Sequence, residues 1–173
     1  MNRDLASPGW AALVIGRLFH GKGKQAETAA NNGGGEAGFW LLDDIIGPYP
    51  TATNNTAAAP ILIGDLLVDT CQEGVAILDM RDVVSGRAKG SDAAYMLARN
   101  LLAAYLNYGA GACTDPVVTQ AMADAQALLA ATGTDFNRTG NYWKGGKNAA
   151  ANRATALSLA DILDDYNNGM HCS

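Results

Sequence analysis

The stretch SDAAYMLARNLLAAYLNY, residues Ser91–Tyr108, has the clearest structural pattern in the chain. Ser91 or Asp92 can cap the start of a helix here, and Gly109 can end it. The segment is therefore predicted to be an α-helix. Its apolar residues recur every three or four positions, which places them on one helical face: Leu97, Leu101, Ala104, Tyr105 and Tyr108.

Two later segments repeat this pattern. Asp115–Thr132 opens with a capping residue followed by proline, which favours the first turn of a helix, and Gly133 follows it. Lys147–Asn168 has the same apolar spacing and is followed by Gly169. Three such helices, joined by connections of roughly 6–15 residues of which the first is short enough to force an antiparallel pair, predict an all-α fold, an antiparallel bundle whose helices run up, down and up.

The first half of the chain is less regular. The segment ILIGDLLV, residues 61–68, fits either a buried strand or a helix, so one short strand pair is left open. We expect a single domain over residues 1–173, with a loop-rich part over 1–88 and a three-helix core over 89–173. The other predicted elements are helices over Pro8–Phe19, Phe39–Ile46 and Cys71–Ser85, separated by polar connections over Gly21–Gly38 and Pro48–Pro60.

Composition excludes two classes of partner. The formal net charge is −5 and only 17% of residues are charged, with no cluster of lysine and arginine, so nucleic acid is not expected to bind. No apolar run approaches the roughly 20 residues of a membrane-spanning helix. We therefore expect neither a nucleic-acid partner nor a membrane span.

The segment GRLFHGKG, Gly16–Gly23, resembles a phosphate-binding loop only superficially. That motif ends in a serine or threonine whose hydroxyl binds magnesium, and Gly23 stands at that position. The loop also follows a predicted helix instead of a strand. The segment is therefore interpreted as a helix end and a turn, and no nucleotide or other cofactor is expected.

Metal and nucleophile chemistry lack the usual patterns. The chain has three cysteines, Cys71, Cys113 and Cys172, and two histidines, His20 and His171; only His171 and Cys172 are neighbours, and there is no Cys-x-x-Cys. A structural zinc site normally takes four such ligands. There is no Gly-x-Ser-x-Gly motif, and His171 stands close to the chain end. The prediction is that the chain is not an enzyme and has no catalytic or metal-binding residue.

Two features keep a ligand hypothesis open. Asp161 and Asp165 are one helical turn apart, so their carboxylates could bind a cation or serve acid–base chemistry, although a solvated helix face is the favoured interpretation. Tyr142 and Trp143, in TGNYWKGGKN, could form an aromatic platform for a carbohydrate. For that pair the favoured interpretation is that the two rings cover the open end of the helical core.

The second half of the chain resembles a module found in secreted and cell-surface bacterial proteins. The similarity covers roughly Lys89–Ser173 and rests on LARNLLAAYLNYGAGAC, DPVVTQAMADAQALLA, ANRATALSLADILDDYNNG and the final HCS. Such modules carry an upstream GFW or GYWKN signature. Gly38-Phe39-Trp40 corresponds to it, although Leu41-Leu42 replaces the usual basic and amide residues. The resemblance implies an extracellular structural or interaction role, and it implies no catalytic residue.

Two hypotheses about function follow. The first is a non-catalytic extracellular module that associates with itself, as a surface or filament subunit, or with other surface proteins. The second is a carbohydrate-binding or hydrolytic domain that uses the Tyr142-Trp143 loop and the Asp161/Asp165 pair.

The up, down and up order also predicts a disulfide. Cys113 lies in the connection after the first helix of the bundle, and Cys172 lies just beyond the end of the third, so both fall at the same end. A Cys113–Cys172 bond would close a loop of about 60 residues and stabilise the fold by roughly 4 kcal/mol in the chain-entropy model. Cys71 is a rival partner, and three reduced thiols in a cytoplasmic protein is the competing interpretation.

Overall fold

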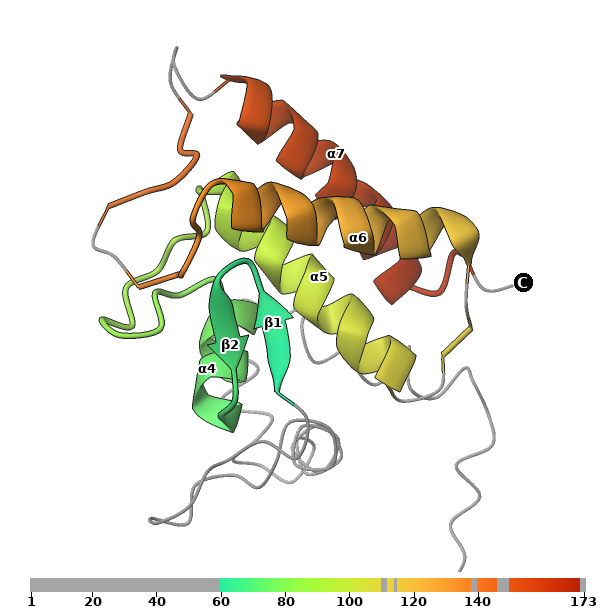
Figure 1. The fold of residues 1–173 in the computed structure, drawn as a ribbon, viewed down its shortest axis with the longest axis horizontal. Helices are drawn as coiled ribbons and strands as arrows, with labels where there is room; N and C mark the ends of the chain where they lie inside the picture. The colour runs from blue at the N-terminus through green and yellow to red at the C-terminus, as the bar shows by residue number, and fades with distance from the viewer. Residues whose placement is uncertain (1–59, 110–111, 114, 138–139, 146–149, 172–173) are drawn as a thin grey trace, which may run out of the picture.

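The computed structural model describes residues 60–109, 112–113, 115–137, 140–145 and 150–171. Over these residues the fold is four helices packed together, preceded by a short antiparallel β-hairpin (Figure 1). The prediction of a mainly helical protein with one short strand pair is confirmed. The predictions for Pro8–Phe19, Gly16–Gly23 and Phe39–Ile46 fall outside the described residues.

Three long helices form the bundle: α5 (Ala93–Gly109), α6 (Pro116–Ala131) and α7 (Ala150–Asn167). Helices α5 and α7 run in the same direction and α6 runs the opposite way, as Figure 1 shows. The up, down and up arrangement is therefore confirmed. One consequence is that the end of α5, the start of α6 and the end of α7 meet at one end of the bundle.

The helix ends follow the cap chemistry expected from the sequence. The Asp115 side chain accepts a hydrogen bond from the Val117 N–H at 2.7 Å, and proline stands at the start of α6. Gly133 and Gly169 both have positive φ angles, of 63° and 80°, and they follow α6 and α7. The Asp92 side chain accepts a hydrogen bond from the Ala94 N–H at 3.1 Å. Asp92 therefore caps α5, which begins at Ala93, two residues after Ser91.

The ambiguous segment 61–68 is a hairpin. Strand β1 (Ile61–Ile63) pairs with β2 (Leu66–Val68), with Ile61 opposite Val68. Gly64, at a φ of 60°, begins the two-residue turn, which suits a residue without a Cβ atom. Its backbone N–H and carbonyl both bond to the Gln126 side-chain amide, at 2.9 and 3.0 Å, so the turn is fixed to α6.

The helix predicted over Cys71–Ser85 is wrong in its second half. Helix α4 spans Cys71–Leu78 and has a capping box between Thr70 and Glu73 at its start. Beyond it the Asp82 side chain accepts hydrogen bonds from the Ser85 N–H at 2.6 Å and from the Ser85 hydroxyl at 2.7 Å. Local side-chain bonds of this kind offer the backbone an alternative to helix, and a turn forms there.

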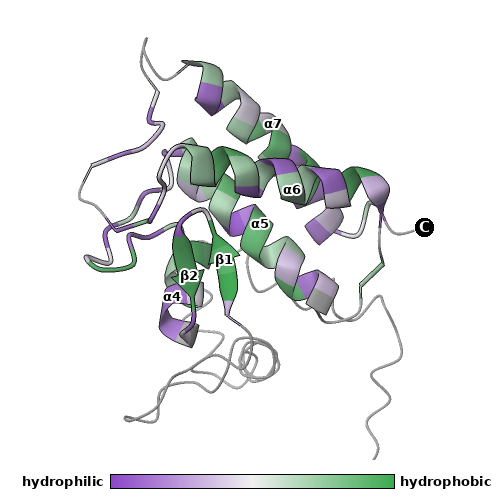
Figure 2. Ribbon diagram, viewed as in Figure 1, coloured by the Kyte–Doolittle hydropathy of each residue, from purple (hydrophilic) through white to green (hydrophobic). Residues whose placement is uncertain are grey.

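Helix α5 is the centre of the core, because α4, α6, α7 and β1 all pack against it. Figure 2 shows both hairpin strands as hydrophobic and the connection between α4 and α5 as a mixture of hydrophilic and hydrophobic residues. None of the helices in the described part of the chain is long and apolar enough to span a membrane. The largest fully buried side chains are Tyr95, Phe136, Ile63, Ile77, Leu97, Leu101, Leu102, Leu106, Leu129 and Leu163.

Candidate functional site

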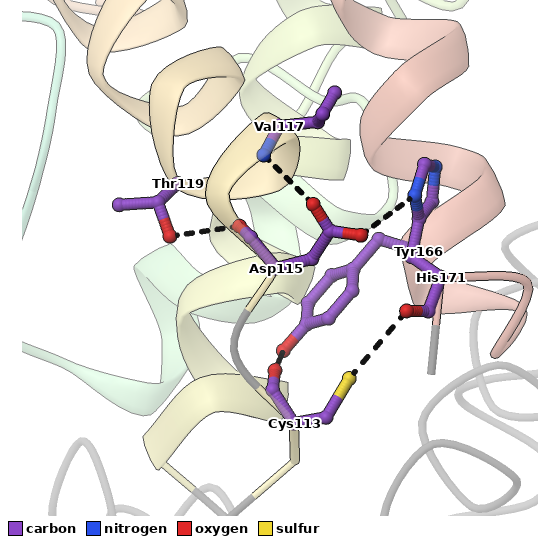
Figure 3. A network of polar contacts seen from close by, with 6 residues as sticks. All are labelled: Cys113, Asp115, Val117, Thr119, Tyr166 and His171. Atoms are coloured by element: carbon purple, nitrogen blue, oxygen red, sulfur yellow. Dashed lines mark hydrogen bonds and ion pairs between the residues drawn. The ribbon is translucent and has the colours of Figure 1, made fainter. Parts of the chain in front are cut away.

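A cluster of polar contacts lies where α5 ends, α6 begins and α7 ends, and Figure 3 shows it from close by. His171 Nδ1 is 3.3 Å from Asp115 Oδ2, so the segment after α7 contacts the N-cap of α6. The Tyr166 hydroxyl donates to the Cys113 carbonyl at 3.0 Å. We call Cys113, Asp115, Tyr166 and His171 the C-terminal cluster.

Two groups of the C-terminal cluster have shifted proton affinities. The hydrogen bond from the Val117 N–H lowers the pKa of Asp115, and the Val118 N–H and His171 lower it further against an opposing effect of desolvation. Burial raises the pKa of the Tyr166 phenol, and the nearby Tyr108 adds to this effect. Asp115 is therefore charged at neutral pH, and it can pair with a protonated imidazole.

The predicted disulfide has one partner in this cluster. Cys113 Sγ lies 3.9 Å from the carbonyl oxygen of His171, the residue directly before Cys172 (Figure 3). Cys172 itself lies outside the described residues, and so does the side chain of Cys71, the first residue of α4. The pairing of Cys113 with Cys172 therefore stays a prediction, and what the structure shows is that His171 lies beside Cys113.

The Tyr142-Trp143 loop is held against the start of α5. Asp92, which is fully buried, accepts the backbone N–H of Tyr142 at 2.6 Å and that of Trp143 at 2.9 Å. Arg153 Nη1 donates to the Trp143 carbonyl at 3.0 Å, and the Lys89 ammonium donates to the Gly140 carbonyl at 2.6 Å. The loop is thus fixed by its backbone.

The two rings of this loop are placed differently. Trp143 is only 5% exposed, so its indole offers little surface to a ligand. Tyr142 is half-buried and its ring centroid is 5.8 Å from that of Phe136, while its hydroxyl bonds to Asp135. The Phe136 ring meets Tyr95 edge to face at 5.0 Å. This packing agrees with the favoured interpretation that the rings cover the end of the core.

Only one of the two predicted carboxylates faces a hollow. The hollow lies between α5, α7 and the segment after α4, and Asp161 lines it together with Asp164, which faces it in place of Asp165. Arg99 supplies a positive charge to the same surface. Among the described residues no group of three or more histidine, cysteine, aspartate and glutamate side chains could hold a metal ion. The other lining residues are Met80, Gly90, Met96, Asn100 and Ala160.

Five of the six large apolar side chains that are exposed among the described residues lie in two areas of the surface, and Val84 is the exception. Leu62 and Leu67 face each other across the hairpin, and both are 49% exposed. The second area is at the end of the bundle with the C-terminal cluster. We call the first pair the hairpin patch and the second group the end patch. The end patch comprises Tyr108, Val117 and Met170, which are 54%, 57% and 72% exposed.

Sequence reasoning missed two residues that organise these sites. Asp92 was expected only as a helix cap, whereas it also holds a loop 50 residues away. Asp115 was expected as the cap of α6, whereas it also contacts His171. The signal in each case is an aspartate beside a helix start, but nothing in the sequence indicates the second partner.

Comparison of the chain with protein-family models, with curated proteins and with solved structures finds no match.

Proposed function

We propose that this protein is a non-catalytic extracellular structural module that associates with copies of itself, as a surface or filament subunit. The observation that carries the proposal is the grouping of exposed large apolar side chains into the hairpin patch and the end patch. Scattered single apolar residues are normal on a protein surface, whereas grouped ones favour an interaction surface.

The separation of the two patches favours a polymer over a closed dimer. The hairpin turn is fixed to Gln126 in the second half of α6, whereas Val117 lies at the start of that helix. If the hairpin patch of one copy contacts the end patch of another, the interface joins two different surfaces. Contacts of this kind produce open chains of subunits unless the rotation between copies closes a ring.

The extracellular part of the proposal rests on the cysteines and on the family resemblance. Disulfides persist in oxidising compartments and are rare in the cytosol. A Cys113–Cys172 bond would fix the chain end to the α5–α6 connection, and the 3.9 Å contact between Cys113 Sγ and the His171 carbonyl oxygen supports this pairing. Asn137, in an Asn-x-Thr acceptor pattern, is exposed, as a surface modification site must be.

Sedimentation velocity over a range of concentrations, together with negative-stain microscopy, tests self-association. We expect concentration-dependent oligomers or filaments. The double variants Leu62→Ser/Leu67→Ser and Val117→Ser/Met170→Ser should each reduce them. Val84→Ser is the matched control, since Val84 is 71% exposed and belongs to neither patch. A strictly monomeric protein at high concentration would contradict the proposal.

A carbohydrate-binding or hydrolytic domain is the second candidate, and the hollow that Asp161 lines favours it. Carboxylates and a guanidinium on one concave surface can bond to sugar hydroxyls. The other proposed element, the Tyr142-Trp143 loop, offers mainly the half-buried Tyr142, because Trp143 is 5% exposed. Binding on a glycan array that Asp161→Asn abolishes and Asp165→Asn preserves would support this candidate, and an array without binding would count against it.

A further inference from the structure

We infer that copies of this chain join head to tail, because charges of opposite sign lie on the surface at the two ends of the bundle. The inference rests on the self-association proposed above, and it adds the orientation in which two copies meet. In such an assembly the cationic group of one copy faces the acidic group of the next. The cationic group comprises Arg87, Lys144 and Arg153. The acidic group comprises Asp161, Asp164 and Asp165.

The cationic group lies at the end of the bundle where α5 and α7 begin. Arg153 Nη1 donates to the carbonyl of Trp143 at 3.0 Å, and Lys144 is the next residue. Arg87 lies in the connection between α4 and α5, which the Lys89 ammonium joins to the connection between α6 and α7 through a hydrogen bond of 2.6 Å. Both connections lie on the left of Figure 1, whereas α7 ends on the right.

Each charged group shares its end of the bundle with one of the apolar patches. The Asp65 N–H, in the hairpin turn, donates to the Thr134 carbonyl at 2.9 Å, so the hairpin meets the connection that carries Lys144. At the other end the Met170 N–H donates to the Asp165 carbonyl at 3.0 Å, so the acidic group adjoins the end patch. A contact between the hairpin patch of one copy and the end patch of the next therefore brings unlike charges toward one another.

Neither group is neutralised by ion pairs within the described part of the chain. No side chain of the cationic group pairs with a carboxylate there, and no side chain of the acidic group pairs with a cation. The stretches 100–137 and 154–173, which hold the ends of α5 and α7 and the start of α6, contain no lysine or arginine. Arg99 lines the hollow together with Asp161 and Asp164, and it offsets one of the three negative charges.

The carboxylates near the cationic group are mostly engaged in internal contacts. Asp82 and Asp92 are buried and accept backbone N–H groups. Asp79 pairs with Arg81 at 3.7 Å. The surface at this end therefore keeps an excess of positive charge over its exposed carboxylates, which are Asp65 and Asp135.

This separation of charge selects one orientation of two copies. Two acidic groups that face each other repel, and so do two cationic groups, whereas unlike groups attract. The formal net charge of −5 opposes association in general, so a contact that pairs unlike charges is favoured over a symmetric one. Head-to-tail contacts join two different surfaces, and they produce open chains of subunits unless a ring closes.

Charge reversal in the full chain, followed by sedimentation velocity, tests the orientation. Arg87→Glu/Lys144→Glu makes the first end acidic like the second, and Asp161→Lys/Asp165→Lys makes the second end basic like the first. Each double variant alone should associate about 10- to 100-fold more weakly than the wild type, because attractive contacts become repulsive. An equimolar mixture of the two should associate again. A chain with all four reversals should also associate by itself.

Matched controls separate orientation from net charge and from folding. Asp124→Lys changes the net charge by the same amount as Asp165→Lys, at an exposed position of α6 that belongs to neither group. It should weaken association much less than Asp165→Lys does. Arg153 is kept in every variant, because it also holds the Trp143 carbonyl. Far-UV circular dichroism confirms that each variant is folded.

The possible failures are distinguishable. If the wild type is strictly monomeric at high concentration, the proposed self-association is refuted and the orientation with it. If the wild type associates and the reversals leave its association unchanged, the self-association stands and the orientation is overturned. Weakening by each double variant without recovery in the mixture or in the fourfold variant also overturns the orientation, and so does an equal effect of Asp124→Lys and Asp165→Lys.

Discussion

Asp92 Oδ1 accepts a hydrogen bond from the backbone N–H of Trp143 at 2.9 Å, across 51 positions of the sequence. The same oxygen caps α5 through the Ala94 N–H, and the second oxygen takes the N–H of Tyr142. One fully buried carboxylate thus satisfies three backbone donors from two distant segments. It joins the start of the central helix to the loop that covers the core.

Asp92→Ala is expected to destabilise the fold by about 3–5 kcal/mol, because it leaves buried N–H groups without a partner. Asp92→Asn should cost less, about 2 kcal/mol, because its oxygen can still accept while its NH₂ group faces the Tyr142 N–H. Urea denaturation followed by circular dichroism measures both values. Equal losses for the two variants would contradict this reasoning, because they would show that the oxygen retained in Asp92→Asn contributes nothing to stability.

Gly64→Ala should destabilise the protein by more than about 2 kcal/mol. A Cβ atom there would lie 2.5 Å from the Thr134 carbonyl oxygen, and the φ of 60° is unfavourable for alanine. Gly86→Ala is the matched control, since its φ is 66° and no atom lies within 4 Å. That variant should show only the backbone cost of about 1 kcal/mol. Similar losses at both positions would mean that the close approach to Thr134 can relax.

Local chemistry explains which parts of this fold could be predicted. The ends of α6 were predicted because Asp115, Pro116 and Gly133 act on their own helix. The end of α4 was misplaced, since the side-chain bonds of Asp82 to Ser85 compete with an otherwise helical pattern. In ILIGDLLV, two apolar runs around a Gly-Asp pair carry the signal of a hairpin, which the apolar spacing alone left ambiguous.

The sites depended on partners that are distant in sequence, and these could not be predicted. Trp143 in a polar loop looks available to a ligand until the N–H bonds to Asp92 place its ring in the core. The pairing of Asp115 with His171 joins residues 56 positions apart. Predicting either contact requires the packing of the bundle, because no periodicity or motif links the two residues of a pair.

Asn167→Ala is expected to destabilise the fold more than Asn107→Ala. The Asn167 side chain accepts from Asn107 Nδ2 at 2.8 Å and donates to the Asn100 carbonyl at 3.0 Å, which joins α7 to α5. Asn107 Oδ1 is buried and has no hydrogen-bond partner among the described residues, so removing that side chain also removes an unsatisfied atom.

We expect the free energy of unfolding, measured by urea denaturation, to fall by about 2–3 kcal/mol in Asn167→Ala and by about 1–2 kcal/mol in Asn107→Ala. The double variant should lose less stability than the sum of the two single losses, because each single substitution already removes the hydrogen bond between the two side chains. Strict additivity would contradict a direct interaction between the two side chains.

The acid sensitivity of the fold should depend on Asp115. Its pKa is lowered in the folded protein, first by the Val117 N–H, so the folded state binds this proton less readily than the unfolded chain does. The stabilisation is therefore present above the ordinary carboxyl pKa of about 3.9 and is lost as the pH falls through the lower, folded value. Asp115→Asn should therefore make the free energy of unfolding fall less steeply with decreasing pH in this acidic range. Asp124→Asn, at an exposed position within α6, is the control and should leave more of the slope intact.

Alkaline stability should depend on Tyr95, whose phenol is fully buried in the core. Desolvation raises its pKa far above the ordinary value, and the charges of Asp82, Tyr142 and Asp92 raise it further. The folded protein therefore keeps the phenolic proton above pH 10, whereas the unfolded chain releases it. While this holds, each pH unit above about 10 removes about 1.4 kcal/mol of folding free energy through this one side chain.

Tyr95→Phe should consequently reverse its effect with pH. At pH 8 the variant loses the hydroxyl contacts to the Phe136 carbonyl, at 3.3 Å, and to Asp82, at 3.4 Å, and it should be about 1 kcal/mol less stable. Between pH 10 and 12 its stability should fall less steeply than that of the wild type, so the two curves converge and cross. Urea denaturation at intervals of half a pH unit measures both curves. Tyr108→Phe, at a position 54% exposed, is the matched control, and it should keep the slope of the wild type. Parallel curves for wild type and Tyr95→Phe would mean that the buried phenol opens to solvent before it ionises.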